Sequence, residues 1–181
     1  MKLIVGLGNP GERYKNTRHN AGFLFTDRLT GKSEIPVHTD KRSFAVVSHI
    51  MLFGQKIITA QATTFMNESG TGVSMVMEKY GIKNVSDVCI VHDDLDLSFG
   101  MYKIQQGKGP KIHNGITSVE EAVGKDFWRI RIGVDSRAQG TYVSGESYVL
   151  GNFTEEEKFQ LNDVCNRIYT SAEFSLVVGS N

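Results

Sequence analysis

The sequence predicts an α/β protein, a single-domain α/β/α sandwich built around a mixed, mainly parallel, twisted sheet. Two observations lead to this class. Short apolar runs alternate with segments whose apolar residues recur every three to four positions, and this alternation continues along the whole chain. The 181 residues are 40% hydrophobic and 22% charged, which suits a globular protein able to bury a core. Because no linker or repeat interrupts them, we expect one domain over residues 1–181.

The first strands are indicated by apolar runs. Leu3-Ile4-Val5 and Val88-Cys89-Ile90-Val91 are unbroken, as expected for central strands that are covered on both faces. Residues 44–52 and 56–60 flank a short glycine-containing turn and are predicted to form a hairpin.

Two further strands show alternation instead of an unbroken run. They are predicted over residues 100–105 and 128–134. In the second, Arg129 and Arg131 fall on one side and apolar residues on the other, so we expect a strand with one polar face.

Helical periodicity marks three segments between and after these strands. Two of them end at a glycine, a residue that favours the backbone conformation closing a helix. Their apolar stripes are Val73, Val76, Met77 and Tyr80 before Gly81, and Ile116, Val119 and Val123 before Gly124. The last helix opens on a capping box, Thr154 with Glu157, and its predicted apolar face comprises Leu161, Val164, Cys165, Ile168, Tyr169 and Ala172.

Charge and cysteine content exclude several classes of protein. Twenty basic and twenty acidic residues give a net charge of zero, which excludes a globally basic nucleic-acid binder but allows a local basic face. Cys89 and Cys165 have no metal-binding or disulfide spacing and are expected to be buried, reduced thiols. With neither a signal peptide nor a membrane span indicated, we expect a soluble, cytoplasmic, monomeric protein with no membrane or DNA partner.

Polar side chains follow the predicted strands. Asn9 and His19 come after the first strand, Asn67 after the hairpin, Asp93 after the second apolar run and Asn114 after the strand at 100–105. In open α/β sheets, ligands bind at the carboxyl ends of the strands. A histidine, a carboxylate and carboxamides at that edge indicate a hydrolytic site that needs no metal.

His19 and Asp93 are the candidate acid–base pair. A carboxylate that accepts from one imidazole nitrogen fixes the tautomer and leaves the other nitrogen free to take a proton from water. Ser69 and the two cysteines lack the sequence context of a nucleophile, so water is the expected nucleophile and His19 its general base. Asparagine amides can bind a peptide group or stabilise an oxyanion, and an activated ester would need no more.

Other interpretations of these segments stay open at this level. Gly6-Leu7-Gly8-Asn9-Pro10-Gly11 matches the glycine pattern of dinucleotide-binding folds, although the expected helix and acidic residue do not follow it. His92-Asp93-Asp94-Leu95-Asp96 also fits a solvated turn or a divalent-cation site, although no second acidic cluster is available to complete it. His19 by itself also fits a helix cap or a surface residue.

Six motifs in register resemble the bacterial-type peptidyl-tRNA hydrolases, from residue 2 to about residue 170. The first is the glycine-rich segment above, and the others are Thr17-Arg18-His19-Asn20, Thr64-Phe65-Met66-Asn67-Glu68-Ser69-Gly70, His92-Asp93-Asp94-Leu95-Asp96, His113-Asn114-Gly115 and Arg129-Ile130-Arg131-Ile132-Gly133. The resemblance implies hydrolysis of the ester between a peptide and the 3′-terminal ribose of tRNA, without a metal or an organic cofactor.

The resemblance also assigns roles to individual residues. The catalytic set would be His19 as base, Asp93 as its orienting partner, and Asn9, which helps to distinguish an N-blocked peptidyl group from a free aminoacyl group. The implied partner is peptidyl-tRNA, held at its acceptor end and 5′-phosphate region. Contacts to the substrate and tRNA would come from Tyr14, Phe65, Asn67, Asn114, Lys103 and Arg131.

The chain departs from the family pattern in one loop and the strand before it. Pro110, Lys111 and Ile112 stand where small residues are expected, and Gln105 replaces a second basic residue. Phosphate binding is therefore expected to rest on Lys103, Lys108, Lys111 and Arg131. Two rival functions also remain: an RNA-binding protein of this fold that does not hydrolyse its ligand, and a peptidase on a related scaffold.

Overall fold

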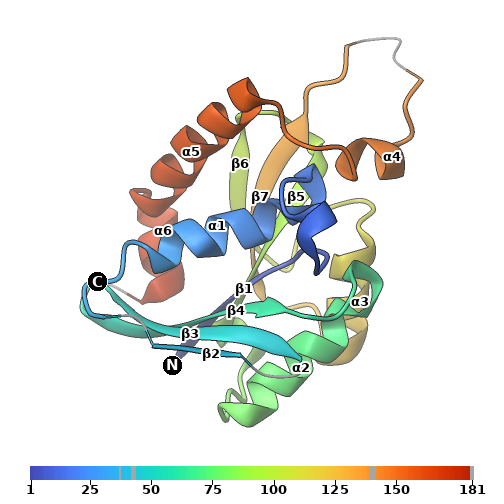
Figure 1. Cartoon of the computed structure of the whole chain (residues 1–181). Coiled ribbons are helices and arrows are strands. Elements are labelled where there is room, and N and C mark those ends of the chain that lie inside the picture. The colour runs from blue at the N-terminus through green and yellow to red at the C-terminus, as the bar shows by residue number, and fades with distance from the viewer. Residues whose placement is uncertain (37, 42–43, 139–141, 180–181) are drawn as a thin grey trace.

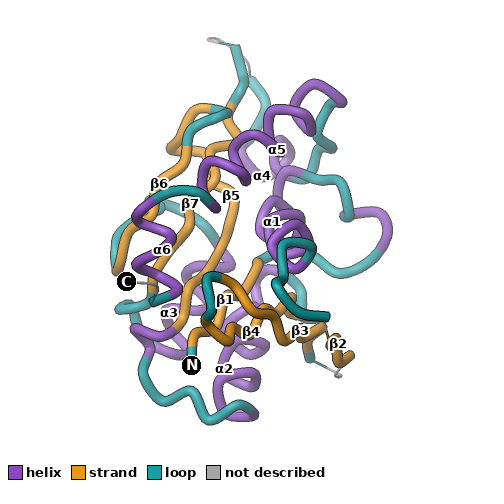
Figure 2. Tube along the Cα trace, turned by 90° about the vertical axis from the view of Figure 1, so that its left-hand side faces the viewer, coloured by secondary structure: helices purple, strands orange, loops and turns teal. Residues whose placement is uncertain are grey.

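The computed structural model describes residues 1–36, 38–41, 44–138 and 142–179. Its centre is a seven-stranded sheet in the order β2-β3-β4-β1-β5-β7-β6, which Figure 2 shows crossing the molecule. The strands are β1 (Lys2–Gly6), β2 (His38–Lys41), β3 (Ala45–Leu52), β4 (Gln55–Ala62), β5 (Val88–Ser98), β6 (Tyr102–Gln106) and β7 (Trp128–Asp135).

The sheet is parallel at its centre and antiparallel at its edges. Strands β4, β1, β5 and β7 run parallel to one another, so their carboxyl ends meet at one edge. Strands β2 and β3 on one side and β6 on the other pair antiparallel. The predicted hairpin is β3–β4, and the two unbroken apolar runs form β1 and the first part of β5, as the sequence predicted.

Helices cover both faces of the sheet, which confirms the predicted α/β/α class (Figure 1). One face carries α1 (Ala21–Thr30), α5 (Glu155–Tyr169) and α6 (Ala172–Val178), and the other carries α2 (Ser69–Lys79) and α3 (Asn114–Val123). Shorter elements are α4 (Gly145–Val149) and the 3-10 turns η1 (Glu12–Tyr14), η2 (Arg18–Asn20), η3 (Met66–Glu68) and η4 (Val85–Asp87). Among the described residues, no helix has the length and apolar character needed to cross a membrane.

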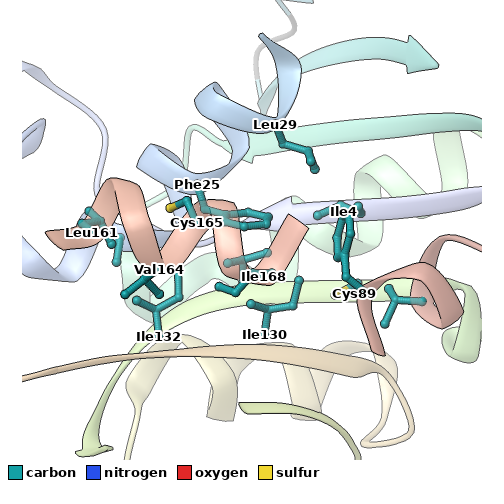
Figure 3. Close-up of a cluster of buried hydrophobic side chains, with 14 of the residues drawn as sticks. Ile4, Phe25, Leu29, Cys89, Ile130, Ile132, Leu161, Val164, Cys165 and Ile168 are labelled. Carbon is teal, nitrogen blue, oxygen red and sulfur yellow. The ribbon is translucent and has the colours of Figure 1, made fainter. Parts of the chain in front are cut away.

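Two apolar cores lie on either side of the sheet. Ile4 of β1 contributes to the core beneath α1 and α5, which Figure 3 shows, whereas Leu3 and Val5 contribute to the core beneath α2 and α3. An unbroken apolar run is therefore required, because alternate side chains enter opposite cores. Cys89 and Cys165 are buried free thiols, as predicted, and burial raises the pKa of Cys165 to about 11.

The last predicted helix is two helices. The capping box is present: the Thr154 hydroxyl accepts from the Glu157 backbone N–H at 3.1 Å, and the Glu157 carboxylate accepts from the Thr154 backbone N–H at 2.8 Å. Helix α5 ends at Tyr169, however, and Ala172 is the exposed first residue of α6. The Ser171 hydroxyl accepts from a backbone N–H of α6, and this N-cap starts a new helix.

The polar face of β7 is buried, which the alternation did not reveal. Only 2% of Arg129 and 8% of Arg131 is exposed. Because β6 is antiparallel to β7, it ends beside Trp128, at the edge away from the parallel strands' carboxyl ends. Residues 107–113, here called the return segment, lead from there to the start of α3. Arg129 donates to the Gly109 carbonyl of this segment, and a Cβ on Gly109 would meet the Arg131 guanidinium, so the segment lies over both arginines.

We expect Ile168→Ala to lower the free energy of unfolding by about 2–5 kcal/mol, because Ile168 is completely buried on the inner face of α5 and its truncation leaves a cavity. Urea denaturation would measure the change. Phe159→Ala on the same helix is the matched control: Phe159 is 77% exposed and its loss should change stability by less than about 0.5 kcal/mol. Similar losses in the two variants would contradict the burial of this face.

Candidate active site

A cleft of about 820 Å³ opens beyond the carboxyl ends of β1, β4 and β5, built from segments that lie far apart in the sequence. Seven of the nine predicted site residues line it, and Lys103 and Arg131 do not. The full lining is Asn9, Tyr14, His19, Phe65, Met66, Asn67, Asp93, Leu95, Asp96, Lys111, Ile112, His113, Asn114, Gly145, Glu146, Val149 and Leu150.

His19 lies in η2, immediately before α1, and reaches Asp93 near the middle of β5. Helix α1 can begin this close to the sheet because Gly22 has no side chain: a Cβ there would come within 2.6 Å of the Leu7 backbone nitrogen. The Nδ1 atom of His19 lies 2.8 Å from Oδ1 and 3.0 Å from Oδ2 of Asp93. Because an ionised carboxylate only accepts, Nδ1 carries the proton and Nε2 keeps its lone pair.

Asp93 accepts from a second imidazole. The Nε2 atom of His113 lies 3.0 Å from Oδ1 of Asp93, while its Nδ1 accepts from the backbone N–H of Ile116 at 3.2 Å and caps α3. Nε2 of His113 therefore carries a proton, which it donates to Asp93. Unlike His19, His113 has both nitrogens occupied by protein groups, so it is suited to holding Asp93 and not to taking a proton from a ligand.

The pKa shifts of the pair keep Asp93 ionised and make His19 more basic. Burial by itself would raise the pKa of Asp93, but the charges and hydrogen bonds of His19 and His113 outweigh burial and hold it well below its usual value. Burial would lower the pKa of His19, but Asp93, with a smaller contribution from Glu146, raises it above its ordinary value of 6.5. Asp93 thus stays ionised while His19 is a stronger base than a free imidazole.

His19, Asp93 and His113 also place three potential metal-ligand atoms within 4.8 Å of one another in the described part of the chain. The hydrogen bonds do not fit a metal. A metal on Nε2 of His113 would force the ring proton onto Nδ1, where it would oppose the N–H of Ile116.

The acidic residues after Asp93 are likewise committed to protein groups. Asp94 pairs with Arg131 at 2.6 Å, and the Asp96 carboxylate accepts the Lys111 backbone N–H at 2.9 Å. The cluster therefore serves as an anchor for the neighbouring strand and the return segment.

Asn9 is held at its backbone and at one side of its amide. Its N–H donates to Oδ1 of Asn20 at 2.8 Å, and Nδ2 of Asn20 donates to its carbonyl at 3.0 Å. The Oδ1 atom of Asn9 accepts from the Met66 backbone N–H at 2.9 Å. Since Oδ1 is occupied, Nδ2 is the group that Asn9 offers to a ligand, and it acts as a donor.

Lys103 and Arg131, which were predicted to bind phosphate, both lie outside the cleft lining, in different surroundings. Lys103 is exposed on the edge strand β6, outside the cleft. Arg131 lies beneath the return segment, with Nε on Asp94 and Nη1 on Oε1 of Gln105 at 3.0 Å. A direct phosphate contact by Arg131 does not fit this placement, because the guanidinium is enclosed by protein acceptors. The exposed lysine that does line the cleft is Lys111.

Two residues of the site were assigned no role from sequence. Asn20 holds Asn9, and His113 holds Asp93. Each is the direct neighbour of a predicted residue, in the pairs His19-Asn20 and His113-Asn114. A polar residue next to a functional one is the signal that would have marked them as supports.

Comparison with known proteins decides the family. The sequence model of the family described as peptidyl-tRNA hydrolase matches residues 3–180. The chain belongs to the peptidyl-tRNA hydrolase family. Curated family members include "Peptidyl-tRNA hydrolase" of Mycobacterium leprae (strain Br4923), 40% identical over 179 residues, which are 98% of this chain and 88% of that protein. "Peptidyl-tRNA hydrolase" of Fusobacterium nucleatum is 36% identical over 168 residues, which are 93% of this chain and 85% of that protein.

A solved structure of the family agrees in fold. The crystal structure of peptidyl-tRNA hydrolase from Acinetobacter baumannii matches with a TM-score of 0.86 at 31% identity, covering 99% of this chain and 89% of that one. The resemblance that the six motifs indicated is thereby confirmed for the family and the fold.

Replacing Asp93 by Asn should lower the pKa of His19, since burial would then act with far less opposition. NMR titration of the His19 ring, assigned with the His19→Gln variant, would measure it. Asp163→Asn, an exposed carboxylate on α5, is the control and should leave the titration unchanged. An unaltered His19 pKa in Asp93→Asn would show that the pair does not act as described.

Proposed function

We propose that this chain hydrolyses the ester between the peptide and the 3′-terminal ribose of peptidyl-tRNA, releasing the peptide and free tRNA. The observation that carries the proposal is the His19–Asp93 pair, 2.8 Å apart in the wall of a cleft, with Nε2 of His19 free of the carboxylate. Family membership supports the substrate, since the curated relatives are named for this activity.

The proposed reaction uses water as the nucleophile. Nε2 of His19 takes a proton from water as the water oxygen bonds to the ester carbonyl carbon. Asp93 stabilises the imidazolium that forms. When the intermediate collapses, the bond between the carbonyl carbon and the ribose oxygen breaks, and His19 returns the proton to that oxygen. General base catalysis of this kind is typically worth about 10² to 10⁴ in rate.

The amides of the cleft suit the acyl part of the substrate. Asn9 offers a donor, because its Oδ1 is held by Met66. A donor can bind the carbonyl oxygen of a peptide group, whereas a free α-ammonium group also only donates and finds no acceptor there. This supports the preference for an N-blocked peptidyl group. Asn67 and Asn114 are exposed in the cleft and are proposed to bind the remaining peptide and ribose groups, with Tyr14 and Phe65 beside them.

The tRNA is proposed to be held at its acceptor end and 5′-phosphate region by exposed lysines outside the reacting centre. Lys103, Lys108 and Lys111 are exposed on β6 and the return segment. Arg131 is proposed to act indirectly, by holding Asp94 and Gln105 in place. The proposed steps use side chains of one chain only, so we further propose that the protein acts as a monomer. We also propose that it needs no metal or cofactor and that it acts in the cytoplasm.

His19→Ala should lower kcat/KM on N-acetylaminoacyl-tRNA by about 10² to 10⁴, since the base is lost. Release of free tRNA measures the rate, and filter binding checks that tRNA is still bound. His38→Ala, an exposed histidine on the edge strand β2, is the matched control and should retain full activity. If the unaltered protein binds tRNA but does not hydrolyse the ester, an RNA-binding role is favoured instead.

Lys111→Ala should weaken tRNA binding and reduce the slope of log K against log salt by somewhat less than one, because one phosphate contact is lost. Binding measured between about 50 and 200 mM salt gives the slope. Lys83→Ala removes an exposed lysine that precedes β5 at the opposite edge of the sheet and should leave the slope unchanged. Equal slopes in both variants would place Lys111 away from the phosphates.

A further inference from the structure

Two segments of the cleft share one pattern of exposure. In the first, Phe65 is 51% exposed, Met66 is buried and Asn67 is exposed. In the second, Ile112 is 89% exposed, His113 is buried and Asn114 is exposed. Each segment thus presents a large apolar side chain and an amide two positions apart, on either side of a residue packed into the protein.

These two segments lie against each other. Gly115, just after the second, is so close to the first that a Cβ there would be 2.5 Å from Sδ of Met66. All six residues of the two segments also line the same cleft, so Phe65 and Ile112 are presented to it from adjoining segments. Two apolar side chains and two amides therefore line neighbouring parts of the cleft.

The exposure of Ile112 is imposed by its neighbours. On one side, the Lys111 backbone N–H is bound to Asp96 at 2.9 Å. On the other, the His113 ring is fixed between Asp93 and the N–H of Ile116. With both adjacent residues held, Ile112 keeps its side chain in the cleft, although an apolar side chain left in water forgoes the favourable free energy of burial.

A peptide matches this lining better than a nucleotide does. A peptide carries amide groups at regular intervals with side chains between them. The two segments likewise offer apolar side chains and amides in alternation. A nucleotide carries phosphates, and Lys111 is the one lysine or arginine among the described residues that line the cleft.

We propose that Ile112, together with Phe65, forms an apolar subsite for the side chain of the ester-linked amino acid, so that this chain selects peptidyl groups ending in an apolar residue. The proposal rests on the proposed function and deepens it. Ile112 stands where the family resemblance leads us to expect a small residue, so the selectivity is proposed for this chain alone.

The test compares two non-hydrolysable ligands that differ only in one side chain. N-acetyl-leucine and N-acetyl-serine are each joined by an amide to the 3′ position of the same cytidine-cytidine-adenosine trinucleotide. The unaltered protein should bind the leucyl ligand about tenfold more tightly, the lower end of what an apolar contact gives in a partly open site. Ile112→Ser should reduce the ratio to about twofold, and Ile112→Val should keep most of it.

Leu176→Ser is the control, because Leu176 is an exposed apolar residue on α6, outside the cleft, and its ratio should equal that of the unaltered protein. The proposal is overturned if Ile112→Ser keeps the full ratio, or if neither ligand binds. It is also overturned if both ligands weaken equally, since Ile112 would then contact the shared nucleotide. Selective binding with no hydrolysis of the corresponding esters would refute the proposed function and leave this subsite standing.

Discussion

The geometry of the site follows from the burial of one carboxylate. Asp93 lies inside the protein, where an unpaired charge would cost several kcal/mol, so donors must be brought to it. His19 comes from the start of α1 on one face of the sheet, and His113 from the start of α3 on the other. The same carboxylate therefore joins two helical layers. It also makes the two histidines unequal, because the N–H of Ile116 occupies the second nitrogen of His113 and leaves His19 as the ring able to exchange a proton.

Sequence patterns were sufficient where local rules decide the structure. The apolar runs of β1 and β5, the glycine-terminated helices α2 and α3 and the capping box of α5 follow from periodicity and backbone preference. They were insufficient on β7. Alternation shows that Arg129 and Arg131 share a face, but what covers that face depends on the direction of β6, which is set by strand pairing. The break before Ala172 was missed because this residue fits the apolar stripe of the preceding helix. In the structure, the N-cap at Ser171 starts a new helix there.

The same distinction applies to the candidate site. His19, Asp93 and Asn9 were predictable because each follows one of the apolar runs of the central strands and carries a recognisable chemistry, although Asp93 lies within β5 and not beyond its end. What supports them was not, since support depends on which atom meets which. Glu157 illustrates this: the sequence identifies it as part of a helix cap, and only the fold shows that it also pairs with Arg18 at 2.8 Å, 139 positions earlier and next to His19. The last helix is thereby attached to the turn that carries the base.

Before His113, the residues that fix the backbone of the return segment differ from the side chains that this segment presents to the cleft. There the backbone is held from outside the segment, by Arg129 at the Gly109 carbonyl and by Asp96 at the Lys111 N–H, whereas His113 is held through its own ring. The side chains of Lys111 and Ile112 can consequently be exchanged during evolution without displacing Asn114 or the His113 ring that supports Asp93. A lineage with this architecture can adjust which peptides or RNA ends it favours while its reacting centre is inherited unchanged.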